Sequence, residues 1–489
     1  MAMCADRGTM SRLIIASRVV KVQAGLLAAL VAFAAMPEAQ AQQRTWVGAG
    51  SDGNWSTQPN WSGAIANNNI GTLTFSGTSQ TSTFNNLTGL NAPLVFSAGA
   101  GAFTINGNGF KTGALTNSSG VTQTINVPLE VLGTNYTMTL TGDIVINGVV
   151  SSTTSAAGIN INAGNGALYL NGDNVGYIGS VTLNATRTLV LGHNNALGVG
   201  NFNWNNGVLN VTSGSSFSSS ANPVINATSG TFGGSGNLTF TGTTSFNSTT
   251  ARSLNIQSGT LALGTVGGAN TTTTFSKSGA GTLVLGGPVS TIAATNVSAG
   301  TLFVNGNFSS LTTGTVAAAA TLGGNGTLSG TMRMNGTLAP GSTGGNVGLL
   351  TLNDLILSST SRTLIDINGS VRGTGFDAVT ANAGLTYSGT LNFNMPTLLT
   401  GTFNVFDFAS TTGSLATVSG LLGTQSVSFT NSGGVWTAPL TNGTATFTQS
   451  TGELVIVPEP VTIALAGLGL GCVGVAVWRR RAVRCQARR

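Results

Sequence analysis

Cysteine and histidine are almost absent from this chain. Of its 489 residues only three are cysteines, Cys4, Cys472 and Cys485, so the region between residues 42 and 458 has none. That region therefore forms neither disulfide bonds nor a thiolate metal site. His193 is the single histidine, and no Gly-x-Ser-x-Gly motif accompanies it. A Ser-His-Asp hydrolase is therefore not expected, and we interpret His193 as a turn residue.

Charged side chains are also scarce, at 6% of the chain, although the formal net charge is +6. The positive charge lies at the two ends. Residues 1–41 carry four basic side chains and residues 479–489 carry six, whereas residues 42–458 hold eight basic and nine acidic ones. The central region is therefore close to neutral and lacks the basic surface that nucleic-acid binding requires, so no nucleic-acid partner is expected.

Short segments in which apolar and polar residues alternate run through the chain from residue 42 to 456. Gly, Asn or Ser bounds them, and examples are 71–75, 166–170, 187–191, 281–285, 300–304, 389–393 and 452–456. Alternation with a period of two predicts β-strands. No segment between the two ends shows a helical period or a capping sequence, so we predict an all-β fold.

The strand pattern repeats at a spacing near twenty residues. A Gly-x-Leu-x-Val/Leu unit occurs at 258–263, 280–285 and 299–304, and related units follow at 321–328 and 335–338. Such periodicity predicts a right-handed parallel β-helix, or β-solenoid, with ladders of Thr, Ser and Asn outside. Roughly 20 residues per coil would give about 15–18 coils and a rod of about 70–90 Å. Residues 396–456 are richer in aromatics and less regular, and we expect them to form a small antiparallel cap.

The N-terminal end of this region and several internal segments also carry a recognisable pattern. The segments 45–55 and 60–63, the turn 192–198, and the segment 323–330 followed by 338–341 resemble the autotransporter-associated β-strand repeat. This resemblance implies a solenoid like that of autotransporter passenger domains over residues 45–395. Only about 60 residues separate the last repeats from Pro458. That is too few for the translocating barrel of an autotransporter, so self-export is not expected.

The tryptophans of the same region allow two interpretations. Trp46, Trp55 and Trp61 either cap the first coils, which we favour, or stack on sugar rings together with Trp204 and Trp436.

The N-terminus has the composition of a signal peptide. Four basic residues between positions 7 and 21 precede a short apolar stretch at 24–35, and Ala39-Gln-Ala41 follows. The apolar stretch is too short to span a bilayer. The small-x-small pattern of Ala39 and Ala41 predicts cleavage by signal peptidase before Gln42, which makes 1–41 a signal peptide and the chain an exported one.

The C-terminus combines three features in order. Pro458, Glu459 and Pro460 precede an uncharged apolar run at 461–478, and three consecutive arginines follow it: Arg479, Arg480 and Arg481. A run of this length is just sufficient for one membrane-spanning helix, and the arginines would keep the tail in the cytoplasm as a stop-transfer signal. The segment 457–489 resembles the PEP-CTERM sorting signal, which a membrane peptidase of the exosortase family recognises. The alternative is an ordinary tail anchor, which would not need the Pro-Glu-Pro sequence.

Candidate groups for catalysis or metal binding are few. The only local concentration of charge comprises Asp354, Arg362, Asp366, Arg372 and Asp377. Adjacent coils would bring Asp366 and Asp377 together near Arg372, either as an acid/base site or as a solvated, salt-bridged face, which we favour. The segment 323–328 lacks the aspartate of calcium-binding β-roll repeats. We therefore predict no catalytic residues, metal or cofactor.

These observations favour an exported structural or adhesive protein of the cell envelope or extracellular matrix of a Gram-negative bacterium. The PEP-CTERM resemblance implies processing by an exosortase and a role in biofilm or exopolysaccharide matrix. Two alternatives stay open: a polysaccharide-degrading enzyme on a β-helix scaffold, and a carbohydrate-binding adhesin without catalysis.

Overall fold

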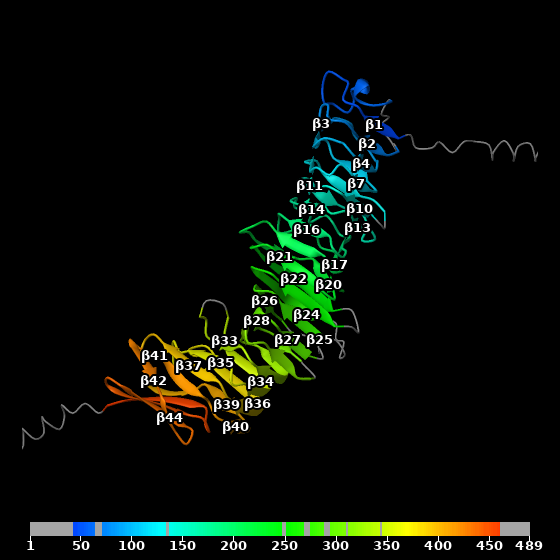
Figure 1. Cartoon of the computed structure of the whole chain (residues 1–489). Helices are drawn as coiled ribbons and strands as arrows, with labels where there is room; N and C mark the ends of the chain where they lie inside the picture. Colours follow the sequence, from blue (N-terminus) through cyan, green and yellow to red (C-terminus); the bar gives the residue numbers. More distant parts are fainter. Residues whose placement is uncertain are drawn as a thin grey trace, which may run out of the picture.

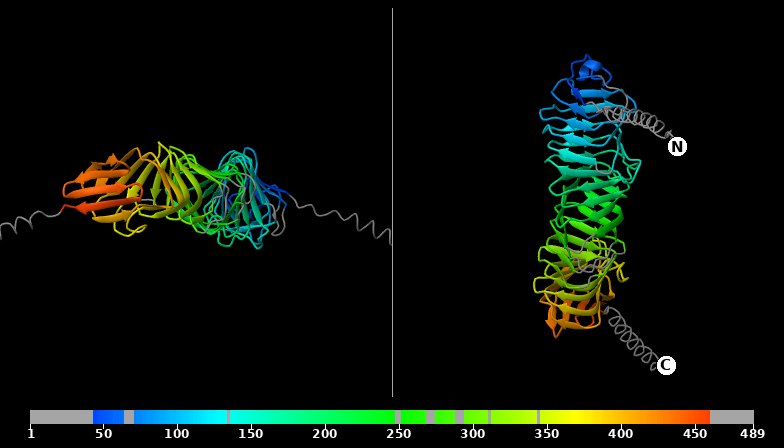
Figure 2. Two further views of the ribbon diagram at one scale, coloured as in Figure 1. Left: turned by 90° about the horizontal axis from the view of Figure 1, so that it is seen from below. Right: turned by 90° about the vertical axis from the view of Figure 1, so that its right-hand side faces the viewer.

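The computed structural model describes residues 43–63, 71–133, 136–246, 251–267, 274–287, 294–309, 312–342 and 345–459. The predicted fold class is confirmed: the described chain is all-β and forms a parallel β-solenoid of the right-handed type with about 14 turns. The coils stack into a rod with β1 (Arg44–Trp46) at one end and an antiparallel sheet at the other (Figures 1 and 2). Within the described residues the one helical element is the 3-10 turn η1 (Gln58–Asn60).

Two long sheets make the walls of the solenoid. Sheet A consists of β1, β2 (Leu73–Phe75), β4 (Leu94–Phe96), β7 (Leu115–Asn117), β10 (Tyr136–Leu140), β13 (Gly158–Ala163), β15 (Ser180–Leu183), β17 (Asn201–Trp204), β19 (Ser216–Ser219), β20 (Asn222–Ile225), β22 (Asn237–Phe246), β24 (Thr260–Gly267), β26 (Thr282–Leu285), β28 (Gly300–Val304), β31 (Ala320–Gly324), β33 (Thr337–Pro340), β35 (Arg362–Asp366), β37 (Thr390–Met395), β41 (Thr417–Leu422) and β42 (Gln425–Ser428).

Sheet B consists of β3 (Ser82–Asn85), β5 (Thr104–Gly107), β8 (Gln123–Ile125), β11 (Ile144–Ile146), β14 (Ala167–Leu170), β16 (Thr188–Leu191), β18 (Val208–Val211), β21 (Gly230–Gly233), β23 (Arg252–Ile256), β25 (Thr274–Ser278), β27 (Ala294–Val297), β29 (Asn307–Phe308), β30 (Gly314–Val316), β32 (Thr327–Met334), β34 (Leu349–Leu357), β36 (Ala378–Tyr387), β39 (Phe406–Phe408) and β40 (Thr411–Gly413). A short sheet C in the early coils contains β6 (Phe110–Thr112), β9 (Leu129–Val131) and β12 (Val150–Ser151).

The core is a set of apolar ladders that run along the rod axis. In sheet A, Leu261, Leu283, Leu302, Leu322 and Leu338 occupy paired positions on successive strands, and each is fully buried. Because side chains alternate between the two faces of a strand, the intervening residues point outward. Each buried leucine contributes about 2–3 kcal/mol through the loss of its apolar surface from water, so the stacked repeats make one continuous core.

The predicted polar ladder on the outer surface is confirmed. Asn126, Asn147 and Asn171 each donate a side-chain hydrogen bond of 2.8 Å to the asparagine one coil earlier, starting from Asn106. These bonds join residues 20 to 24 positions apart, whereas equivalent bonds near the C-terminal end join residues 27 to 30 apart. The prediction of 15–18 coils was therefore too high, because it assumed roughly 20 residues for every coil. At ~4.8 Å per stacked strand, about 14 turns make a rod of about 65 Å.

The first coil is closed by aromatic rings. Trp46 and Trp61 pack edge to face with ring centroids 5.0 Å apart, and Trp55 packs on Trp61 at 5.8 Å. All three indoles are at most 3% exposed and contact Phe75 of the next strand. The interpretation of these tryptophans as a cap is confirmed.

The C-terminal end is closed by a five-stranded antiparallel sheet, here named the terminal sheet. It consists of β38 (Gly401–Asn404), β43 (Thr430–Ser432), β44 (Val435–Leu440), β45 (Gly443–Thr448) and β46 (Glu453–Pro458). Phe447 of β45 packs on Phe393, Tyr387 and Phe406 of the last coils. The strands β39, β40 and β41 fall within 396–456 but still pair in parallel with the solenoid, so the parallel coils extend beyond residue 395.

A lysine side chain lies completely buried inside the solenoid wall. Lys277 of β25 has no exposed surface, and its ammonium donates to the carbonyl oxygens of Gly279, Gly281 and Ala299 at 2.6, 2.5 and 2.7 Å. A Cβ on Gly300 would lie 2.4 Å from this nitrogen, and Gly300 also has a φ of +64°, so glycine is required there. Burial lowers the pKa of Lys277 to about 8, while the three carbonyl acceptors favour the charged form.

Candidate functional site

The predicted sorting motif begins where the last strand leaves the terminal sheet. Pro458 ends β46 and pairs with Gly443 of β45, and the Glu459 amide donates to the Asn442 carbonyl at 3.0 Å. Both Pro458 and Glu459 are exposed. The start of the motif is therefore held on the protein surface, whereas Pro460 lies outside the described residues.

The other predicted processing residues also lie outside the described residues: Ala39, Ala41, Gln42, the apolar segment 461–478, Arg479, Arg480 and Arg481. Among the residues that the structure does describe, no helix is both long enough and apolar enough to cross a membrane.

Asp366 and Asp377 come together, although not through adjacent coils as predicted: they lie in the same coil and meet through the loop between β35 and β36, which an antiparallel bridge of Ile367 and Phe376 closes. The Asp377 amide donates to the Asp366 carbonyl at 2.8 Å, and the Asp377 carboxylate accepts hydrogen bonds from the amides of Gly348 at 2.7 Å and Asp366 at 2.9 Å. Asp377 is only 2% exposed, and burial raises the pKa of its carboxyl to about 7 even though the two amide donors favour the ionised form. Its two oxygens thus hold the end of β35 and the backbone just before β34 together.

Arg372 does not join the two carboxylates. Its guanidinium donates to the carbonyls of Asn404 and Val379, both at 3.0 Å, and to the Thr380 hydroxyl at 3.1 Å. It therefore clamps β36 to the end of β38. Of the charged cluster expected from the sequence, only Asp366 and Asp377 form a direct contact within the described residues.

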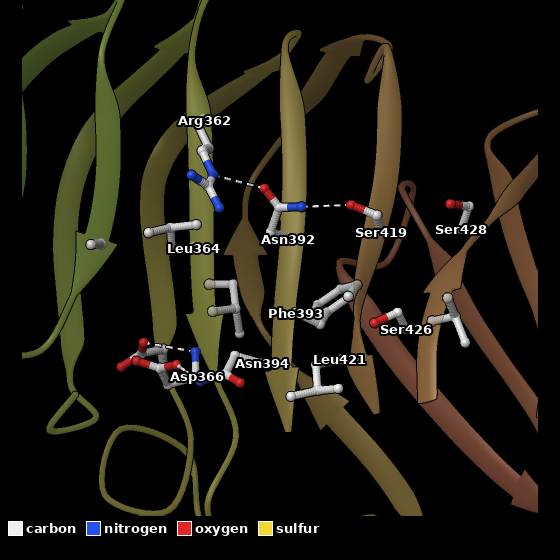
Figure 3. Close-up of a pocket in the computed structure, with 15 residues that line it drawn as sticks. Arg362, Leu364, Asp366, Asn392, Phe393, Asn394, Ser419, Leu421, Ser426 and Ser428 are labelled. Atoms are coloured by element: carbon white, nitrogen blue, oxygen red, sulfur yellow. Dashed lines mark hydrogen bonds between the residues drawn. The ribbon is translucent and has the colours of Figure 1, made fainter. Parts of the chain in front are cut away.

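These two aspartates line an open groove of ≈ 580 Å³ on the outer face of sheet A near the C-terminal end (Figure 3). The lining residues come from β33, β35, β37, β41 and β42, except Asp377, which directly precedes β36. They are Ala339, Arg362, Leu364, Ile365, Asp366, Asp377, Asn392, Phe393, Asn394, Ser419, Gly420, Leu421, Ser426, Val427 and Ser428. Strand β42 runs antiparallel to β41 and forms the last edge of the groove. Of the lining residues, only the two aspartates and Arg362 were candidates in the sequence. Nothing in the sequence pattern distinguished the others.

The remaining candidates do not form a recognisable reactive site. His193 lies in an exposed turn, as predicted, and its Nδ1 accepts a hydrogen bond from the Asn195 amide at 3.2 Å. Trp204 and Trp436 are 0% and 5% exposed, so, like the tryptophans of the first coil, they present no ring face for stacking on a sugar. No group of three or more His, Cys, Asp or Glu side chains in the described residues is arranged to hold a metal ion.

Comparison with known proteins found no similar family: no family model matches the chain, and the search of curated proteins gave no match. The resemblances to the PEP-CTERM signal and to autotransporter repeats therefore rest on the sequence motifs alone.

Proposed function

We propose that this chain is an exported structural protein of the cell envelope or extracellular matrix of a Gram-negative bacterium. In this account signal peptidase removes residues 1–41, and an exosortase then recognises Pro458, Glu459 and Pro460. The segment 461–478 holds the substrate in the inner membrane before processing, and the arginines that follow it stop transfer.

The observation that carries the proposal is the position of the folded region between the two processing points. β1 starts at Arg44, two residues after the predicted signal-peptide cleavage, and β46 ends at Pro458, the first residue of the sorting motif. Cleavage at either point would leave all strands of the described fold intact. An enzyme acting on Pro458 and Glu459 would also meet them exposed on the surface.

The nature of the folded region supports a structural role. It has no cysteine and a net charge near zero, and its stability comes from stacked apolar ladders, asparagine ladders and caps at both ends. A rod of this kind presents a long, regular, polar outer surface, which suits a component of a matrix or biofilm.

The test is a triple alanine substitution of Pro458, Glu459 and Pro460, followed by cell fractionation and mass spectrometry. We expect a full-length protein that stays in the membrane, whereas the natural chain loses its tail. The matched control replaces Thr430, Asn431 and Ser432 of β43 by alanine, because these residues are also exposed in the terminal sheet. An unchanged mature C-terminus in the Pro-Glu-Pro variant would refute the sorting account.

A second candidate, cleavage of a polysaccharide, is favoured by one observation: Asp366 and Asp377 line the same groove, and Asp377 has a pKa raised to about 7. A carboxyl with a raised pKa beside a second carboxyl is a feature of acid/base pairs. We favour the structural role, because backbone amides occupy both oxygens of Asp377. Measured release of reducing ends from polysaccharides, lost in a D366N/D377N variant, would establish the enzyme instead.

A further inference from the structure

The groove on sheet A is an ordered array of short polar side chains. The strand register places Leu364, Asn392, Ser419 and Ser428 in one row across four strands. Asp366, Asn394, Leu421 and Ser426 form a second row beside it (Figure 3). Since neighbouring strands lie ~4.8 Å apart, each row spans about 14 Å, the length of a short extended oligomer.

Hydrogen bonds between strands fix the orientation of these side chains. Arg362 Nε donates to Asn392 Oδ1 at 2.9 Å, and Asn392 Nδ2 donates to Ser419 Oγ at 2.5 Å. In the second row, Asn394 Nδ2 donates to Asp366 Oδ1 at 2.7 Å. The groove is thus held in one arrangement before any ligand enters, which lowers the entropic cost of binding.

The network leaves several polar atoms available to a ligand. Within the described residues, the two terminal nitrogens of Arg362, Oδ2 of Asp366 and Oδ1 of Asn394 make no hydrogen bond, and neither do the hydroxyls of Ser426 and Ser428. The Arg362 nitrogens form a planar pair of donors, the geometry that matches a carboxylate. The other atoms suit hydroxyl groups, which both donate and accept.

Two of the charged groups of the groove, Arg362 and Asp366, stand at its opposite sides. Arg362 and Asp366 are four residues apart on β35, which corresponds to about 13 Å along the strand. A ligand that fits both must carry negative charge near Arg362 and uncharged hydroxyls near Asp366. Leu364, Leu421 and Gly420 lie between the polar positions and offer apolar contact for the C–H faces of a ring.

We propose that this groove binds a short segment of a linear glycan in which one uronic acid stands among neutral sugars. The uronate carboxylate pairs with Arg362, and the hydroxyls of the neighbouring sugars bond to Asp366, Asn394 and the serines of β42. The proposal is independent of how the tail is processed, since none of the groove residues belongs to either targeting segment.

The test measures binding of two matched ligands to the full-length protein in mild detergent by isothermal titration calorimetry. The ligands are cellotriose and the same linear trisaccharide with C6 of its middle glucose oxidised, which makes that sugar glucuronic acid. We expect the acidic ligand to bind about tenfold or more tightly than the neutral one, as one bidentate charged pair would give.

Three variants locate the site. R362Q should abolish the preference for the acidic ligand. R333Q should preserve it, because Arg333 is exposed on β32 in sheet B, away from the groove. S426F should weaken both ligands by filling the groove from β42. Melting temperatures within a few degrees of the natural protein would show that each variant is folded.

The proposal is overturned if neither ligand binds, if the two ligands bind equally, or if R333Q lowers the affinity as much as R362Q does. The last result would indicate non-specific attraction of the acidic ligand. None of these three outcomes would bear on the sorting proposal, because that proposal is tested by the position of the mature C-terminus.

Discussion

Lys277 offers a sharp test of how this solenoid is stabilised. Its ammonium is completely buried and makes three hydrogen bonds, to the carbonyls of Gly279, Gly281 and Ala299. Ala299 lies on the following coil, just before β28, so the lysine joins two successive coils of the rod.

The substitution K277M keeps much of the side-chain length but removes all three donors. A buried carbonyl that loses its partner costs about 1–3 kcal/mol. All three carbonyls lose the hydrogen bond from the lysine. Gly281 keeps a second hydrogen bond, from the Thr301 amide at 3.3 Å, whereas the carbonyls of Gly279 and Ala299 keep no other hydrogen bond within the described residues. We therefore expect the free energy of unfolding to fall by about 2–5 kcal/mol at pH 10, where the folded lysine is neutral and methionine relieves no buried charge.

The pH dependence of the free energy of unfolding provides a second test of Lys277. The ordinary lysine pKa of 10.5 applies to the unfolded chain, and burial lowers the folded value to about 8. Between these values the unfolded state binds more protons than the folded state, so stability increases as the pH rises. The expected gain from pH 8 to 10 is about 1–3 kcal/mol. Burial raises the pKa of Tyr136, Tyr177 and Tyr387, which opposes stability only when the pH exceeds about 10.

The assay is guanidinium unfolding followed by far-UV circular dichroism at several pH values, for the natural chain and for K277M. Hydrogen exchange of the amides in β25, β26 and β28 would show whether the loss is local, since repeat proteins need not unfold in one step. If the natural chain and K277M respond alike to pH between 8 and 10, Lys277 is not the buried, titrating group described here.

Further predictions concern the ladders. L302A should lower the free energy of unfolding by about 2–5 kcal/mol through cavity formation, whereas the neighbouring outward-facing T301A should cost less than about 1 kcal/mol, both measured by chemical denaturation. N147A removes two hydrogen bonds of the asparagine ladder at an exposed position, and a loss of only about 0.5–1.5 kcal/mol is expected. Equal losses in L302A and T301A would contradict the assignment of the two faces of β28.

Much of the fold was predictable because it follows from alternation. The segments 71–75, 281–285 and 300–304 each contain a strand of sheet A, and the leucines of that pattern are the buried ones. The buried position of Lys277 was also within reach, since it stands two residues after Phe275 and must point to the same side of the strand. Lysine side chains are normally exposed, so the residue type pointed away from burial at this position.

The coil number and the groove could not be read from the chain in the same way. Coil length varies with the loops, and the loops carry no periodicity. The aspartates of the groove stand out in the sequence as charges, and Asn392 is an outward position of the predicted strand 389–393, whereas Asn394 lies just beyond that segment. Their convergence with Ser426, however, depends on the antiparallel return of β42, which no local pattern indicated.

The central claim is that the exported rod is released or transferred at Pro458-Glu459-Pro460, and the mass of the mature protein tests it most directly. Intact-mass and terminal-peptide analysis would be made on protein from cells and from culture fluid. The account predicts a chain that starts at Gln42 and ends at or near residues 458–460, without the apolar segment or the arginines. A mature chain that still ends at Arg489 would contradict it.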